Sequence, residues 1–171
     1  MDAKGENAVP DERECLCLLR EYGTPERVIA HCRGVERVAR RMCEALKEKG
    51  YPLDLSLVKA GALLHDIART EKHHDRVGAE YLKSIGLDRV GRLVAVHMSL
   101  PERDRTRISE KMLVYLADKL VSEDTEVTLA ERFARSLEKA GPQMRPFIES
   151  RYEDAKKILA LVQTALAFPD V

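Results

Sequence analysis

Histidine and aspartate stand at four places where a helical periodicity would bury them. His31 falls on an apolar stripe, His65 and Asp66 follow an apolar series, His97 ends another stripe, and Asp118 lies within the segment LVYLADKLV. A buried carboxylate costs several kcal/mol unless a positive charge pairs with it. We expect no Lys or Arg on these faces, so the favoured positive charge is a metal ion.

Each residue taken alone has a plainer interpretation. A single histidine on an apolar face is often a hydrogen-bonded core residue, and Asp118 could pair with Arg or Lys from another helix. Four helices would then each need a separate explanation, which favours the shared metal. Neighbours on a helix diverge by about 100°, so His65 and Asp66 could flank an ion near a helix end.

The elements that must position these residues are all predicted to be helices. Thr24 can cap a helix that begins at Pro25 and ends at Gly50, and Asp54 can cap a helix over 55–68. Further helices are predicted over 74–84, from the residue after Asp88 onward to include His97, over 110–121 with Ser109 as cap, and over 127–139 and 143–167. No alternating strand pattern appears, so the prediction is an all-α helical bundle of about seven or eight helices.

Composition narrows the class of protein. The 171 residues carry 29 Lys plus Arg and 29 Asp plus Glu, and 44% are hydrophobic. The balanced charge disfavours a general nucleic-acid binder or a membrane-surface protein, and no apolar run approaches the roughly 18 residues of a membrane span. The polar, acidic N-terminus does not resemble a secretory signal. Four cysteines without a paired motif are expected to be core residues in a reducing compartment, so we predict a cytoplasmic protein.

The chain is short for two domains. We expect a loose tail over 1–10 and one domain over 11–171, in which residues 25–122 form the metal-site core and residues 123–171 a C-terminal helical extension. An apolar stripe on the last helix, from Ile148 to Val162, either closes this core or meets a second subunit in a homodimer.

Three segments together resemble a known superfamily. His31, then ALLHDIAR at 62–69, then VYLADKL at 114–120 look like the signature His…His-Asp…Asp of the HD-domain metal-dependent phosphohydrolases. The resemblance covers about residues 25–122. It implies that His31, His65, Asp66 and Asp118 bind a first metal ion.

Two further segments resemble the compact dinuclear, six-ligand members of that superfamily. HDRVGAEYL, which begins at His74, and VAVHMS, which contains His97, match the segments that hold a second metal ion there. The resemblance therefore implies that His74 and His97 bind a second ion and that Asp66 bridges the two. The adjacent His73 could replace His74, although the register of the following Gly-Ala pair favours His74.

The resemblance also implies an activity: hydrolysis of a phosphate ester or anhydride of a small metabolite, with a nucleotide favoured and a metal-bridging hydroxide as nucleophile. Asp66 would help orient that hydroxide, and Arg69, one helical turn beyond His65, would grip a substrate phosphate. Iron or manganese is favoured, and zinc, nickel and cobalt also suit such ligands. Lys119 is expected at the surface or in a salt bridge. The alternatives are an HD-type di-iron oxygenase and a metal-containing nucleotide-binding regulator.

Overall fold

The computed structural model describes residues 9–167 and contains eight α-helices within them. They are α1 (Glu12–Tyr22), α2 (Glu26–Glu48), α3 (Leu55–Leu64), α4 (His74–Ser84), α5 (Asp88–Val94), α6 (Glu110–Lys119), α7 (Leu129–Lys139) and α8 (Arg145–Ala167). A 3₁₀ turn (Glu102–Asp104) precedes α6, and a short hairpin of β1 (Val121–Ser122) and β2 (Thr125–Glu126) follows it. The predicted all-α class is confirmed.

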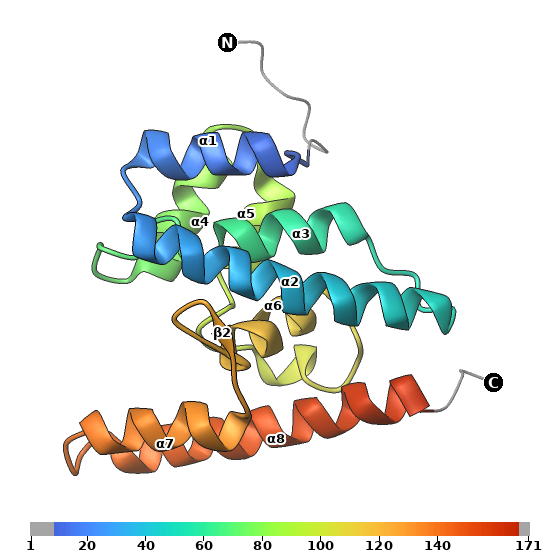
Figure 1. Ribbon diagram of the computed structural model, residues 1–171, viewed down its shortest axis with the longest axis vertical. Helices are drawn as coiled ribbons and strands as arrows, with labels where there is room; N and C mark the ends of the chain where they lie inside the picture. The colour runs from blue at the N-terminus through green and yellow to red at the C-terminus, as the bar shows by residue number, and fades with distance from the viewer. Residues whose placement is uncertain (1–8, 168–171) are drawn as a thin grey trace.

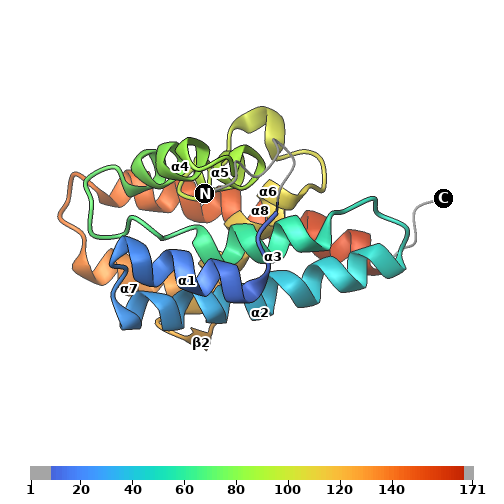
Figure 2. The ribbon, with the colours of Figure 1, turned by 90° about the horizontal axis from the view of Figure 1, so that it is seen from above.

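The helices pack around one cluster of buried hydrophobic residues that extends from α1 to α8. The long helix α2 packs along α3 and α6, and α4 packs against α5. Figure 1 shows α7 and α8 side by side along one edge of the molecule, joined to α6 through the hairpin. Figure 2, from above, shows α1, α2 and α3 lying nearly parallel.

Helix α2 begins one residue later than predicted, and Thr24 does not cap it. Its N-cap is Pro25, and the Thr24 hydroxyl donates a hydrogen bond to the main-chain oxygen of Ile67 at 2.7 Å. Thr24 thus ties the start of α2 to the turn after α3. The predicted caps Asp54 and Ser109 are confirmed, since their side chains accept from main-chain N–H groups in the first turns of α3 and α6.

Helix α3 is shorter than the predicted 55–68, because the chain leaves the helix after Leu64. Tight turns follow, in which Ile67 N–H donates to Leu64 and Arg69 N–H to Asp66. In the same way α5 ends at Val94, and His97 lies in turns beyond the helix rather than on it. Both segments place their histidines just past a helix end.

The hairpin was not predicted, and it shortens two neighbouring helices. Helix α6 ends at Lys119 instead of 121, and α7 begins at Leu129, where Thr128 and Glu131 form a capping box. Gly34 lets the hairpin approach α2, because a Cβ there would lie 3.0 Å from the main-chain oxygen of Asp124. This close approach holds the hairpin beside the start of α2.

Residues 1–8 of the predicted tail lie outside the described residues, whereas Val9 is half-buried and Pro10 is buried. Three cysteines are buried, but Cys17 is exposed, so the expectation of a core position is wrong for that residue. The apolar stripe of α8 packs on the hydrophobic cluster through Ala155, Ile158 and Val162. Within residues 9–167, none of the helices combines the length and the apolar character that a membrane crossing needs.

Candidate metal centre

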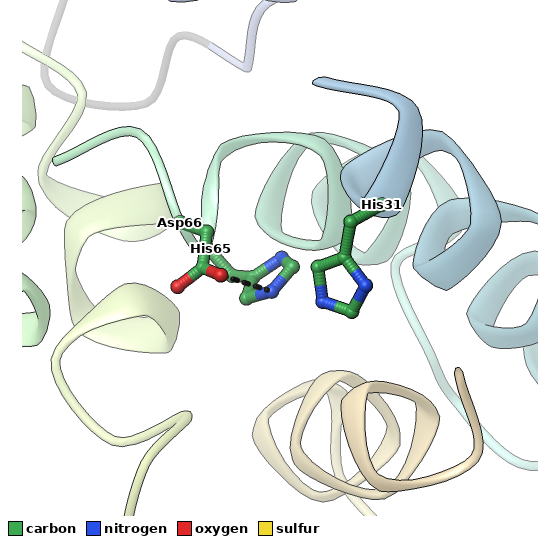
Figure 3. A group of neighbouring side chains, drawn as sticks. All are labelled: His31, His65 and Asp66. Atoms are coloured by element: carbon green, nitrogen blue, oxygen red, sulfur yellow. Dashed lines mark ion pairs between the residues drawn. The ribbon is translucent and has the colours of Figure 1, made fainter. Parts of the chain in front are cut away.

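Four imidazoles and two carboxylates meet where α2, α6 and the turns after α3 and α5 come together with the start of α4. They are His31 on α2, His65 and Asp66 after α3, His74 at the start of α4, His97 after α5 and Asp118 on α6. Figure 3 shows His31 reaching from α2 toward His65 and Asp66. The structure brings together all six residues that the sequence predicts as metal ligands.

His31, His65 and Asp66 form one half of the centre, close to an oxygen of Asp118. His31 Nε2 lies 3.1 Å and His65 Nε2 3.6 Å from Asp118 Oδ1. Asp66 stands beside them, with its Oδ2 3.6 Å from His65 Nε2. Ligand atoms of His31, His65 and Asp66 all lie within 4.8 Å of one another.

The other oxygen of Asp66 faces the second half of the centre. Asp66 Oδ1 lies 3.2 Å from His74 Nε2 and 3.4 Å from His97 Nε2. These three residues also offer ligand atoms within 4.8 Å of one another. The carboxylate of Asp66 therefore belongs to both groups, with one oxygen turned to each. His73, by contrast, is exposed and stands in a left-handed conformation at the residue before α4, where its side chain makes no capping hydrogen bond.

Main-chain oxygens fix the orientation of three of the imidazoles through their Nδ1 atoms. His31 Nδ1 lies 2.7 Å from the oxygen of Glu123, His65 Nδ1 2.8 Å from that of Ala62, and His97 Nδ1 2.7 Å from that of Val94. A carbonyl oxygen only accepts, so each Nδ1 carries a proton, and in the neutral form of each ring the lone pair is on Nε2, which faces the carboxylates.

This arrangement fits a metal ion. His65 Nε2 and His97 Nε2 are buried and have no hydrogen-bond partner within the described residues. Lone pairs that face carboxylate oxygens are unfavourable unless a proton or cation lies between them. Imidazole nitrogen with carboxylate oxygen suits Fe, Mn, Co, Ni or Zn, and the Nδ1 hydrogen bonds are the second-layer contacts usual for metal-binding histidines.

The electrostatics of the buried groups favour ionised carboxylates. Burial alone would raise the pKa of Asp66, but the imidazoles of His65, His74 and His97 around its two oxygens favour the ionised form and bring the pKa far below its usual range. Burial is likewise overcome at Asp118, where the Lys119 ammonium and the neighbouring imidazoles of His31 and His65 lower the pKa. Burial lowers the pKa of His97 and so favours its neutral, metal-binding form.

Lys119 places a cation beside these buried groups, where no Lys or Arg is expected from the sequence. Its buried side chain bends back along α6, and Nζ lies 2.6 Å from Asp118 Oδ2 and donates to the main-chain oxygen of His97 at 3.0 Å. Asp118 thus has a protein counter-charge at Oδ2, whereas its Oδ1 faces the histidines. Of the two expected positions for Lys119, the salt bridge is the one observed.

Arg69 lies at the exposed edge of the centre, as its place beyond His65 predicts. Its Nε is 3.6 Å from Asp66 Oδ2 and its Nη1 3.2 Å from His74 Nε2, and its side chain is 47% exposed. The guanidinium lines a cavity of about 800 Å³ that also borders Asp66 and Asp118. A group entering this cavity would meet Arg69 and the centre together.

Helices α7 and α8 also line this cavity, through arginines that were not predicted as site residues. Arg132 and Arg151 line it there. Burial lowers the pKa of Lys119, the contact with Asp118 raises it, and the charges of Arg151 and Arg132 lower it again. Both guanidiniums therefore act on the centre's only buried ammonium within the described residues. Both arginines lie in ordinary amphipathic helices, so no local motif marks them.

Comparison with protein families matches the HD domain family to residues 28–123. The match includes all six residues of the centre and ends before α7. No solved structure is significantly similar to the chain.

Three curated relatives are each similar over 72% of this chain. The tRNA (cytidine(56)-2'-O)-methyltransferase of Picrophilus torridus is 36% identical over 141 residues, and the protein of the same name from Thermoplasma volcanium is 33% identical over 140 residues. The chain spans only 40% of the length of each. An uncharacterized protein of Methanocaldococcus jannaschii is 33% identical over 143 residues, which are 85% of its length.

Proposed function

The chain belongs to the HD domain family, and we propose that it is a metal-dependent phosphohydrolase that cleaves a phosphate ester or anhydride of a small metabolite, with a nucleotide favoured. The observation that carries the proposal is Asp66, whose two oxygens face two separate groups of histidines. A carboxylate in that position can be shared by two metal ions, the arrangement used for in-line displacement at phosphorus.

We assign the ligands by the oxygen that each histidine faces. His31, His65 and Asp118 would hold a first ion with Asp66, and His74 and His97 would hold a second ion with the same Asp66. Iron and manganese are the favoured metals, as the resemblance to the HD-domain superfamily implies, and a set of imidazoles and carboxylates without thiolate also suits zinc, nickel and cobalt. When bound, two such ions supply an activated water and positive charge for phosphoryl transfer.

The chain's own residues would then act in three ways. The Nδ1 hydrogen bonds hold the imidazoles in fixed orientations, so little reorganisation is needed during the reaction. Lys119 holds Asp118 through Oδ2, which positions the carboxylate without occupying Oδ1. Arg69 would bind a non-bridging phosphate oxygen, because its guanidinium lines the cavity beside Asp66.

The cavity is of the size that binds small metabolites. A volume of about 800 Å³ lies within the range of about 300–1,000 Å³ usual for such sites. A small phosphorylated metabolite is therefore the proposed partner, rather than a nucleic acid or a membrane, in keeping with the zero net charge. A cytoplasmic location, a single domain and a homodimer stay predictions. The proposal does not include methylation of tRNA, because the chain spans only 40% of the length of the two relatives named as tRNA methyltransferases.

The test is phosphate release from a panel of mono- and dinucleotides, cyclic nucleotides and sugar phosphates. Protein is loaded anaerobically with Fe(II) or Mn(II) and compared with Asp66→Ala and with Asp88→Ala, which removes a carboxylate outside the centre. Release by the wild type and by Asp88→Ala, but not by Asp66→Ala, is expected. Silence from protein that holds two ions would contradict the proposal. Iron-dependent oxygen uptake without phosphate release would support the oxygenase alternative, and nucleotide binding without turnover the regulator.

A further inference from the structure

Charged residues from two regions of the chain line the cavity beside the centre. Asp66, Asp118 and Arg69 belong to the centre and its edge, and Arg132 and Arg151 lie on α7 and α8. These two helices lie beyond residue 123, where the match to the HD domain family stops. What the two arginines bind is therefore a property of this chain's own C-terminal helices.

Arg132, on α7, has an unused hydrogen-bond donor. Its Nε is buried and has no hydrogen-bond partner in the described part of the chain. Its Nη1 lies 3.5 Å from Ser136 Oγ, at the limit of a hydrogen bond. No ion pair of Arg132 is found among residues 9–167. A half-buried guanidinium with an unused donor is costly unless a ligand completes it.

Arg151 lies in a comparable state on α8. Its guanidinium stands over the ring of Phe147 at 5.3 Å, and no carboxylate of residues 9–167 forms an ion pair with it. Nearby arginines are different. Arg105 pairs with Asp154 at 2.6 Å, and Arg135, also on α7, donates to Ser122 at 2.8 Å and does not line the cavity.

We propose that Arg132 and Arg151 form a second anion subsite, so that the substrate is a nucleotide carrying a phosphate group in addition to the one that is hydrolysed. The inference rests on the proposed function, because it assigns the other phosphate to Arg69 and the centre. Two guanidiniums that line one cavity and form no ion pair among residues 9–167 can attract an anion and hold it through paired N–H donors. Nucleoside 3',5'-bisphosphates have this distribution of charge, since the sugar separates the two phosphates.

The experiment measures equilibrium binding of two probes, adenosine 3',5'-bisphosphate and adenosine 5'-monophosphate, to the metal-loaded protein by calorimetry. The wild type is expected to bind the bisphosphate about tenfold or more tightly than the monophosphate. Arg132→Gln and Arg151→Gln should each weaken the bisphosphate about tenfold and the monophosphate less than about twofold. Arg132→Lys, which keeps the charge, should recover part of the loss. Arg135→Gln is the matched control on the same helix and should change neither affinity.

The inference would be overturned if the wild type bound the two probes equally or bound neither. It would also be overturned if Arg132→Gln weakened the binding of each probe no more than the control Arg135→Gln does. Thermal melting of each variant identifies one that has failed to fold, and the two arginines on separate helices provide independent tests. The outcome is separable from the proposed function. Phosphate release that is unaffected by Arg132→Gln leaves that function standing without the subsite, whereas an Arg132-dependent preference without phosphate release leaves the subsite standing without hydrolysis.

Discussion

The metal centre and the α7–α8 pair face the same cavity but handle charge in opposite ways. In the centre, buried carboxylates lie against imidazoles whose orientation main-chain oxygens fix, and Lys119 neutralises part of the charge. On α7 and α8, Arg132 and Arg151 are half-buried and form no ion pair within residues 9–167. The first region is built to hold cations and the second to receive an anion. This division assigns chemistry to the family core and selectivity to the C-terminal helices.

The largest effect is expected from removing one histidine of the second group. His97→Ala should lower the metal content from two ions per chain toward one and reduce phosphate release about 100-fold or more, because a ligand and its fixed orientation are both lost. Elemental analysis of purified protein measures the metal, and His74→Ala should behave alike. Arg132→Gln is the control from the other region and should keep both ions. Unchanged metal content in both histidine variants would refute the second site.

A smaller effect is expected at Arg69, which lies at the exposed edge of the metal centre. Arg69→Gln should reduce kcat/KM for phosphate release by about 10- to 100-fold, since one charged contact to the phosphate is lost. Metal content should not change, because Arg69 is not a ligand. Arg69→Lys should be intermediate, as an ammonium cannot make the paired contact. Steady-state kinetics measure the effect. A kcat/KM in Arg69→Gln equal to that of the wild type would contradict the assignment of Arg69 to the substrate site.

Gly34 tests how the hairpin supports the centre. In Gly34→Ala the new Cβ would lie 3.0 Å from the Asp124 main-chain oxygen and push the hairpin outward. His31 Nδ1 would then lose its contact to Glu123, so metal affinity should fall about tenfold, and the free energy of unfolding by about 1–3 kcal/mol. Metal titration and urea unfolding report the two effects. Gly141→Ala, in the α7–α8 turn where a Cβ meets nothing within 4 Å, should change neither; equal behaviour of the two variants would count against this role.

The smallest effect concerns stability alone. Asp54→Ala removes the cap of α3 and the 2.7 Å contact to Arg89, which should cost about 1 kcal/mol at pH 7 without altering phosphate release. Partial burial raises the pKa of Asp54, but hydrogen bonds from Leu57 and Arg89 bring it below its ordinary 3.8. The ionised cap therefore stabilises the fold above that pH, and the benefit is lost as the pH falls through the lower folded value. Urea unfolding at pH 7 and at pH 3 should show the difference shrinking; a difference that grows on acidification would contradict the assignment.

Much of the centre was predictable because it depends on local periodicity. His31, His97 and Asp118 stand out as polar residues on apolar stripes, and the ligand atoms do converge. The break after Leu64 was not predictable, since the sequence LLHDIA contains no Gly or Pro to end a helix. There the helical hydrogen bonds are replaced by those of tight turns, and the Thr24 hydroxyl donates to the main-chain oxygen of Ile67.

The remaining surprises depend on tertiary contacts that no short pattern encodes. The partner of Asp118 is its neighbour Lys119, whose long side chain bends back against the 100° step of the helix. The two-residue strands of the hairpin are too short to show alternation. The place of Arg132 in the cavity depends on how α7 and α8 dock against the core, and its own segment is an ordinary amphipathic helix.

The central claim is that Asp66 is shared by two metal ions. Its most direct test is an anomalous difference map from crystals of the protein loaded with Mn(II) or Fe(II). Two peaks about 3.5–4 Å apart are predicted, one between His31, His65 and Asp118 and one between His74 and His97, with Asp66 touching both. A single peak, or two peaks of which only one contacts Asp66, would contradict the account.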